Sequence, residues 1–260
     1  MGVKRAKPIG FISIYFIAVL ILVSCGQNQS EKLTIAAAAN MQFAVAELTK
    51  VFSEETGIEC ETVTSSSGKL TAQIIEGAPF DVLLSADMKF PEELYKRGLT
   101  LNEPLVYAYG NLVLWTLKND IEPVLESLSH EDIKHIAMGN PKTAPYGISA
   151  MEVLLETGLE EKLKNKLVFG ESISQTNQFI ISMVADIGFT SKSVVLSSLM
   201  KGRGAWKEID KKLYKPIAQG IVVVNNRDIF QKEAVQFKDF LLSAKGKEIL
   251  YKFGYQVSTK

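Results

Sequence analysis

The sequence predicts an α/β fold with a mostly parallel sheet and helices on both faces of that sheet. Short apolar runs of strand length alternate with amphipathic segments from about residue 32 onward. Several amphipathic segments stop at a glycine, which is where helices commonly end. Strands that alternate with helices pair in parallel, because each helix carries the chain back across the sheet. Roughly 230 residues are enough for one large domain or two lobes.

The chain begins with a segment typical of secretory signals. A basic stretch with Lys4, Arg5 and Lys7 precedes the apolar run of residues 9–23. About 15 apolar residues are too few for a membrane span, which needs roughly 20, but they suit the core of a signal peptide. The run ends in Leu-Val-Ser-Cys at residues 22–25, which resembles the lipobox of bacterial lipoproteins. An uncleaved signal anchor with an incidental cysteine is the alternative.

We therefore predict a lipoprotein signal peptide over residues 1–24, lipid attachment at Cys25, and a flexible polar tether over residues 25–31. The signal holds three of the 29 basic residues and none of the 29 acidic ones, so the mature chain carries 26 minus 29, about −3 charges. Such a chain binds nucleic acid poorly and attracts no anion at long range. With Cys25 lipidated, Cys60 has no partner, and a buried structural thiol is its expected role.

The mature chain starts with a strand and an amphipathic helix. Residues 32–38 form an apolar run of strand length, and Asn40 is placed to cap the helix that follows. Apolar residues recur in that helix at the spacing of one helical face, from Phe43 to Phe52, and Gly57 ends it.

Later elements follow the same signals of periodicity, capping and stop residues. Further strands are predicted at residues 58–64, 80–85, 105–107, 111–117, 135–138, 167–169, 186–190 and 217–224. Further helices are predicted at residues 69–76, 87–97, after a cap at Ser129, and at 145–156, 174–184, 191–201, 230–242 and 245–253.

Four strand-to-helix corners carry small or hydroxyl residues, at positions 36–40, 65–69, 143–147 and 171–174. Ligands of open α/β sheets bind at the carboxyl ends of strands. A helix that starts there offers unpaired backbone N–H groups and a positive dipole end, which together suit an anion. Ordinary helix capping explains any single corner. Four such corners in one chain favour an anion site.

No pattern of residues points to catalysis. No Ser or Cys has a histidine nearby in the sequence, and His130 and His135 lie together in a polar stretch. No cluster has metal-ligand spacing. We therefore expect no catalytic residues, no cofactor and no free metal cation. Sequence distance does not settle spatial proximity, so an exported enzyme on the same fold stays an alternative.

Motifs in order along nearly the whole mature chain resemble the periplasmic molybdate-binding protein family of ABC transporters. The most specific are Gly-Ala-Pro-Phe-Asp at residues 77–81 with Ser-Ala-Asp at 85–87, and Asn-Pro at 140–141 with Ala-Pro-Tyr-Gly at 144–147. Others are LTIAAAANM at residues 33–41, Ser-Ser-Gly-Lys-Leu at 66–70, Ile-Gly-Phe at 187–189 and Lys-Phe-Gly-Tyr at 252–255.

This resemblance implies the two-lobed fold of class II periplasmic binding proteins, with the ligand in the cleft between lobes. Lobe one would comprise residues 32–108 and 220–260, and lobe two residues 109–219. Gly110 and Gly220 would lie in the two hinge strands. The protein would be a lipid-anchored monomer on the outer face of a bacterial membrane, passing molybdate or tungstate to a permease of an ABC transporter.

The family's ligand-binding positions fall on five residues of this chain. Asn40 would contact the oxyanion, with Ala39 beside it as an additional candidate. Ser67 would donate through its hydroxyl and its backbone N–H. Tyr146 and Ile173 would each donate through a backbone N–H. The molybdate would thus be held through its oxygens by neutral groups.

Two positions depart from some family members. Phe189 stands where some members have a ligand-contacting Tyr, as is common in the branch with Asn at position 40. Ala39 stands where at least some of that branch has Thr. Molybdate carries no proton at neutral pH and only accepts hydrogen bonds, so a site of donors suits it, whereas phosphate usually carries a proton that needs an acceptor. A binding protein for sulfate or phosphate is the nearest alternative.

Overall fold

The computed structural model describes residues 1–2, 32–225 and 228–257, and residues 32–260 form one compact unit. The predicted signal peptide, the lipid site at Cys25 and the tether lie outside the described residues, apart from residues 1 and 2. Within the described chain, no helix combines the length and the apolar character needed to cross a membrane.

The first sheet has five strands in the order β2-β1-β3-β10-β4. Its strands are β1 (Leu33–Ala38), β2 (Cys60–Ser65), β3 (Val82–Ser85), β4 (Leu105–Gly110) and β10 (Ile217–Val223). β1 runs parallel to β2 and β3, whereas β10 is antiparallel to β3 and β4. We call this sheet and its helices the first lobe.

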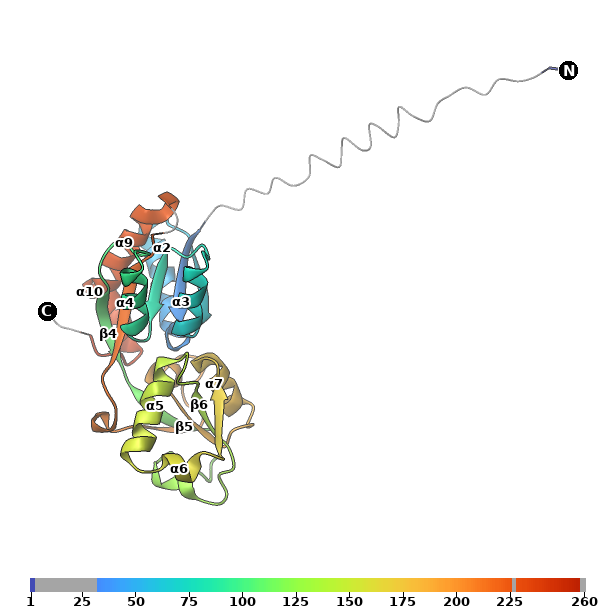
Figure 1. Cartoon of the computed structure of the whole chain (residues 1–260), viewed down its shortest axis with the longest axis vertical. Helices are drawn as coiled ribbons and strands as arrows, with labels where there is room; N and C mark the ends of the chain where they lie inside the picture. Colours follow the sequence, from blue (N-terminus) through green and yellow to red (C-terminus); the bar gives the residue numbers. More distant parts are fainter. Residues whose placement is uncertain (3–31, 226–227, 258–260) are drawn as a thin grey trace. The chain divides into compact units, whose positions relative to one another are not determined.

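Helices cover both faces of the first sheet. They are α2 (Gln42–Thr56), α3 (Ser67–Ile75), α4 (Lys89–Lys96), α9 (Gln231–Leu242) and α10 (Ala244–Lys252). Successive side chains of a strand point to opposite faces. Accordingly Ile35 and Ala37 pack in the core under α2, α9 and α10, while Ala36 packs in the core under α3 and α4. The C-terminal helices α9 and α10 lie beside α2 although they are far from it in sequence (Figure 1).

The second lobe is built on a five-stranded sheet in the order β7-β6-β8-β5-β9. Its strands are β5 (Leu112–Thr116), β6 (Ile136–Gly139), β7 (Leu167–Gly170), β8 (Ile187–Ser191) and β9 (Ala205–Glu208). Its α-helices are α5 (Pro145–Glu156), α6 (Glu160–Leu163), α7 (Ile173–Ile181) and α8 (Lys192–Val195). Short 3₁₀ helices occur at η2 (Ala39–Met41), η3 (Glu126–Ser129), η4 (Lys211–Leu213) and η5 (Asp228–Phe230).

The α/β class and the two-lobed arrangement are confirmed. In each sheet four strands run in one direction, and the fifth, β10 or β5, runs against them. The chain passes between the sheets after β4 and returns before β10. The lobe boundaries at residues 108/109 and 219/220 stay a prediction.

Gly110 and Gly220, expected in the hinge strands, are required by close packing. A Cβ on Gly110 would lie 2.1 Å from the Tyr146 hydroxyl oxygen, and one on Gly220 would lie 2.8 Å from Met88 Sδ. Neither glycine is among those with a positive φ. Their part in hinge motion stays a prediction.

Several local predictions were wrong. Asn40 does not cap α2, because its side-chain amide bonds to distant residues. Ser129 ends a 3₁₀ helix and does not begin a helix. The helix expected to reach residue 201 stops at Val195, and turns containing Gly202 and Gly204 follow.

Cys60, expected to be a buried structural thiol, is free and half-buried in β2, and burial raises the pKa of its thiol.

Candidate functional site

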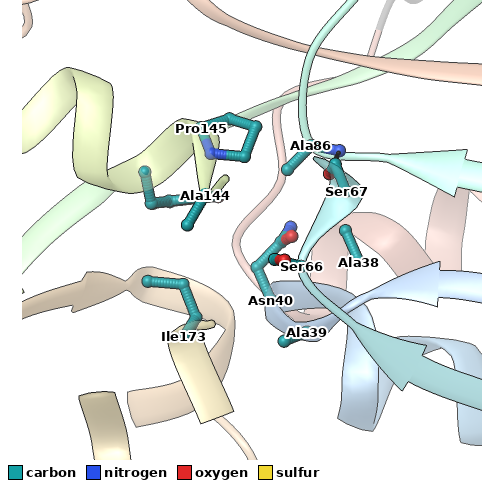
Figure 2. A pocket seen from close by; sticks show the side chains of 10 residues that line it. Ala38, Ala39, Asn40, Ser66, Ser67, Ala86, Ala144, Pro145 and Ile173 are labelled. Atoms are coloured by element: carbon teal, nitrogen blue, oxygen red, sulfur yellow. Dashed lines mark hydrogen bonds between the residues drawn. The ribbon is translucent and has the colours of Figure 1, made fainter. Parts of the chain in front are cut away.

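A small closed cavity lies between the two lobes. Its empty volume is about 190 Å³. The first lobe contributes Ala38, Ala39, Asn40, Ser66, Ser67 and Ala86, and the second contributes Ala144, Pro145, Tyr146 and Ile173 (Figure 2). All of these residues are buried. The cavity is therefore small, and its walls are made of residues that are shielded from solvent.

Three helices begin at the wall of this cavity. α3 starts at Ser67, α5 at Pro145 and α7 at Ile173, each after a strand of its sheet. The first N–H groups of a helix have no acceptor within the helix. Ser66 and Ser172 cap the N–H groups of Lys69 and Gln175, at the third helical position. The caps thus leave the N–H groups of the first helical residues available.

Ser67 offers the cavity a donor. Its hydroxyl oxygen accepts a hydrogen bond from the Ala86 N–H at 2.9 Å, and its side chain is fully buried. Because that contact uses the oxygen as an acceptor, the hydroxyl hydrogen is free to point at a ligand. Ser67 therefore has two donors at the cavity wall, the O–H and the backbone N–H.

Asn40 lines the cavity, but its side chain bonds to the protein. Its amide nitrogen donates to Gln219 Oε1 at 2.8 Å and to the Tyr255 hydroxyl at 2.9 Å. An amide has two N–H donors, so both are engaged. We predicted the Asn40 amide as a contact to the oxyanion. In this structure the backbone N–H is the donor that Asn40 keeps for a ligand.

Tyr146 lines the cavity while its ring points toward Gly110 of β4. The Tyr146 hydroxyl is buried and makes no hydrogen bond to any described residue. It lies against Gly110, where a Cβ would be 2.1 Å away. Burial raises the pKa of this hydroxyl well above its usual value, although the Asn40 side chain opposes the shift. The phenol stays neutral, and the backbone N–H at the start of α5 is the group available to a ligand.

The remaining predicted residues are also located. Ala39 and Ile173 both line the cavity, and Ala39 brings a methyl group where a hydroxyl would be a further donor. Phe189 is buried in β8 and is not among the lining residues. Neither His130 nor His135 lines the cavity.

The lining residues carry no charge, so helix dipoles set the local potential. The first turns of α3, α5 and α7 contain no acidic residue. At the rim, Lys69 of the first lobe forms an ion pair with Glu171 of the second. Among the described residues, no group of three or more His, Cys, Asp or Glu side chains could hold a metal ion. The site can thus bind a compact anion through neutral donors and positive helix ends.

Sequence reasoning did not single out Ala86 as a lining residue, nor the buried partners Gln219, Tyr255 and Ser193. Ala86 directly follows β3, so the end of that strand could have marked it. The partners of Asn40 lie in segments distant in sequence and had no local signal.

Comparison with known proteins agrees with this geometry. The family model described as bacterial extracellular solute-binding protein matches residues 33–256. The molybdate-binding protein ModA of Azotobacter vinelandii is 35% identical over 237 residues, covering 90% of this chain and 93% of the relative. A Bacillus subtilis protein, provisionally named ABC transporter substrate-binding lipoprotein YvgL, is 30% identical over 247 residues, covering 92% and 94%. The solved structure of the A. vinelandii periplasmic molybdate-binding protein matches with a TM-score of 0.83 at 31% identity, covering 88% of this chain and 100% of that one.

Two five-stranded lobes around a closed cavity, with three helices starting at its wall, define a solute-binding protein. The matched residues run from the first strand of the first lobe to its last segment. The chain belongs to the bacterial extracellular solute-binding protein family, and within it to the periplasmic molybdate-binding proteins of ABC transporters. The resemblance inferred from the sequence motifs is thereby confirmed.

Proposed function

We propose that this protein captures molybdate or tungstate outside the cytoplasm and delivers the oxyanion to the permease of an ABC transporter. The observation that carries the proposal is a small cavity between the lobes, lined by uncharged residues that include the Ser67 hydroxyl as a hydrogen-bond donor. The contacts we assign to the ion are the Ser67 hydroxyl and the backbone N–H groups of Asn40, Ser67, Tyr146 and Ile173. Ala39 stays an additional candidate.

The protein's own donors occupy several of the acceptor atoms around the cavity. Ser67 Oγ accepts from the Ala86 N–H, and Ser66 Oγ accepts from the Lys69 N–H. The Asn40 carbonyl accepts from the Ser193 and Tyr255 hydroxyls. A protonated oxyanion such as hydrogen phosphate needs an acceptor for its own O–H, and a buried O–H without an acceptor costs free energy. A fully deprotonated dianion has no O–H group, so its binding does not carry this free-energy cost.

Ligand selectivity tests the proposal. Hydrogen bonds to a charged acceptor contribute about 1.5–3 kcal/mol each, so several can reach sub-micromolar affinity, about −8 kcal/mol at one micromolar. In calorimetric titration, molybdate and tungstate should bind tightly, and sulfate and phosphate weakly. Sulfate is smaller and would form longer, weaker bonds to donors spaced for molybdate. Equal affinity for sulfate would overturn the substrate assignment and leave the fold intact.

Export and lipid anchoring form the second part of the proposal. They are supported by the basic n-region, the apolar run and the lipobox ending in Cys25, and by the name of the B. subtilis relative. Mass spectrometry of the membrane fraction should find a chain that begins at an acylated Cys25, with Cys60 as a free thiol. The Cys25→Ser variant should lack the lipid. An unmodified chain that begins at Met1 would contradict the anchor.

We infer that the protein binds its ligand without chemical turnover. Its relatives are solute-binding proteins, and no carboxylate, histidine or cysteine lines the cavity. A ligand that binds only the folded state should raise the melting temperature. Recovery of the oxyanion unchanged after incubation, together with such a rise, would favour binding over the alternative of an exported enzyme.

A further inference from the structure

A buried polar cluster lies directly behind the cavity wall. Its members are Asn40 in η2, Ser193 in α8, Gln219 in β10 and Tyr255 after α10, and each is at most 2% exposed. Polar groups so deeply buried are costly unless they are hydrogen-bonded, and here they bond to one another. The cluster connects both lobes to β10, the strand with which the chain returns to the first lobe.

The orientation of two amides in this cluster is determined by backbone carbonyls. The Gln219 amide nitrogen donates to the carbonyl oxygens of Ala86 at 3.3 Å and Ile217 at 3.2 Å. Because a carbonyl only accepts, the Gln219 nitrogen must face these two groups and its oxygen must face Asn40. The Asn40 amide nitrogen therefore has to face Gln219, as it does at 2.8 Å. Neither amide can flip without losing these bonds.

Gln219 also connects two of the polar lining residues, Asn40 and Ser67. The Ala86 carbonyl accepts from Gln219, and the Ala86 N–H donates to Ser67 Oγ at 2.9 Å. One line of hydrogen bonds thus runs from Ser67 through Ala86 and Gln219 to Asn40. Gln219 thus contacts Asn40 directly and Ser67 through Ala86, although Gln219 does not line the cavity itself.

The backbone of Asn40 is held from the other side. Its carbonyl oxygen accepts from Ser193 Oγ at 2.7 Å and from the Tyr255 hydroxyl at 3.0 Å. Ser193 belongs to the second lobe and Tyr255 to the first, so the position of Asn40 depends on both lobes. Gln219 itself lies at the irregularity of β10, where the register with β4 shifts between Gln219 and Gly220.

We propose that Gln219 is a positioning residue for anion binding, which orients Asn40 and Ser67 so that their donors converge on the ligand. This inference rests on the proposed function, because it assumes that the cavity binds an oxyanion. A neutral amide is required at position 219, since it must donate to two carbonyls and accept from Asn40 at once. No other neutral side chain of the same length does both.

The variant Gln219→Glu tests this role, because its affinity for molybdate should depend on pH. A neutral carboxyl can still donate to one carbonyl and accept from Asn40, whereas a carboxylate has no donor and places a charge behind the anion. Burial raises the pKa of a carboxyl, so the variant should bind molybdate within about tenfold of wild type near pH 5.5. Above the pKa of the new carboxyl, its affinity should fall by up to about tenfold per pH unit.

Other titrating groups are common to the variant and the wild type. Titratable groups in the segments around this cluster are Asp87 before α4, Tyr107 in β4, Tyr146 in α5 and Tyr255. Burial raises the pKa values of all four. The more exposed residues Glu152 and Lys215 lie near the start of β10. The ratio of variant to wild-type affinity, measured from pH 5.5 to 9, therefore isolates the new carboxyl.

Two further variants complete the test with molybdate. Gln219→Met keeps the shape but removes every hydrogen bond, so its affinity should fall by at least about tenfold at all pH values. Gln236→Glu makes the same charge change at an exposed position of α9 and should bind as wild type does. Circular dichroism of each ligand-free variant checks folding.

The outcomes are distinct. Wild-type affinity in Gln219→Met, or a ratio for Gln219→Glu that does not change with pH, would overturn the positioning role while molybdate binding by the wild type stands. If the wild type itself binds no oxyanion, the proposed function fails first.

Discussion

At the scale of single residues, the hydroxyl of Ser67 shows how a neutral group becomes specific for an anion. Its oxygen is occupied by the Ala86 N–H at 2.9 Å, so only its hydrogen remains for the cavity. The backbone N–H of Ser67 stands at the first position of α3 and has no acceptor in the helix. One residue therefore supplies two donors without any charge to desolvate.

Ser67→Ala should lower molybdate affinity by about 1.5–3 kcal/mol, because it removes one hydrogen bond to a charged acceptor. Ser67→Asp should abolish binding, since it places an anion against an anion. Calorimetric titration measures both. Ser172→Ala is the matched control, because Ser172 caps α7 but does not line the cavity. It should lower stability by about 0.5–2 kcal/mol with little change in affinity. Normal binding by Ser67→Asp would place the site elsewhere.

Some residues of the candidate site could be predicted from the sequence, and others could not. Local sequence marked the corners that hold Ser67, Tyr146 and Ile173, because an unpaired N–H at a helix start depends on local residues, and the resemblance to the molybdate-binding family selected these three residues. The engagement of the Asn40 amide was not predicted. Its partners Gln219 and Tyr255 are 179 and 215 residues away, and an amide gives no local sign of which way it will face.

At the scale of elements, three helix starts provide the site's electrostatics. α3, α5 and α7 begin at the cavity, with no acidic residue in their first turns. Their dipoles and N–H groups are fixed by the fold and do not titrate. This arrangement would allow the predicted mature chain, with its expected charge of about −3, to bind a dianion.

The affinity for molybdate should therefore be nearly flat from about pH 6 to 8, because no group with an unperturbed pKa near 6.5 lines the cavity. It should also respond weakly to salt, since the bound ion is buried. Calorimetric titration at several pH values and ionic strengths is the measurement. A steep fall in affinity from pH 6 to 8 would reveal a cationic side chain at the site.

The carboxyl group of Asp87 determines how we expect the affinity for molybdate to change at low pH. Burial raises the pKa of this carboxyl, while the Phe90 N–H and the Ser85 hydroxyl oppose the shift. Asp87 follows the lining residue Ala86, so its protonation removes a negative charge beside the site. As the pH falls through the pKa of Asp87, affinity should rise, and Asp87→Asn should remove this rise.

Element prediction worked where periodicity was strong and failed where it was weak. α5 spans Pro145–Glu156 as predicted, since a proline at its start and a glycine after its end mark both limits. β9 was missed because it is a short edge strand with mostly exposed side chains, in which Trp206 is the only large apolar residue. Its place in the sheet comes from pairing with β5, which no local pattern reveals.

At the scale of the whole binding unit, a few contacts at the cavity rim hold the lobes together. The Gly68 N–H donates to the Thr143 carbonyl at 3.1 Å, and Ser174 Oγ donates to Gln42 Oε1 at 3.0 Å. Each joins the first lobe to the second. The rim is therefore closed by weak polar contacts, which suits a cavity that must open to load and release its ligand.

Gly68→Ala should weaken this closure. A Cβ at Gly68 would lie 3.2 Å from the Thr143 Cα and carbonyl oxygen and 3.0 Å from Phe90 Cζ, so the lobes would have to separate by a few tenths of an ångström. We expect about a tenfold loss of molybdate affinity, near 1.4 kcal/mol. The ligand-free domain should stay at least as stable, because Ala favours a helix over Gly. Stopped-flow release and thermal unfolding measure the two effects. Unchanged affinity would show that the rim tolerates the methyl group.

The ion pair between Lys69 and Glu171 offers the last test, since it crosses the same rim. Both side chains are substantially exposed, 44% for Lys69 and 63% for Glu171, so breaking the pair alone should cost only about 0.2–1 kcal/mol. Lys69→Glu should cost more affinity, because it sets two carboxylates against each other and adds a negative charge to the first turn of α3. Adding Glu171→Lys restores the pair with its signs exchanged. If rim closure is what the pair contributes, the double variant should recover most of the lost affinity in calorimetric titration, and solution scattering with molybdate should show the same compact form as wild type. A double variant as weak as Lys69→Glu alone would show that Lys69 acts on the anion directly and that the pair does not hold the lobes together.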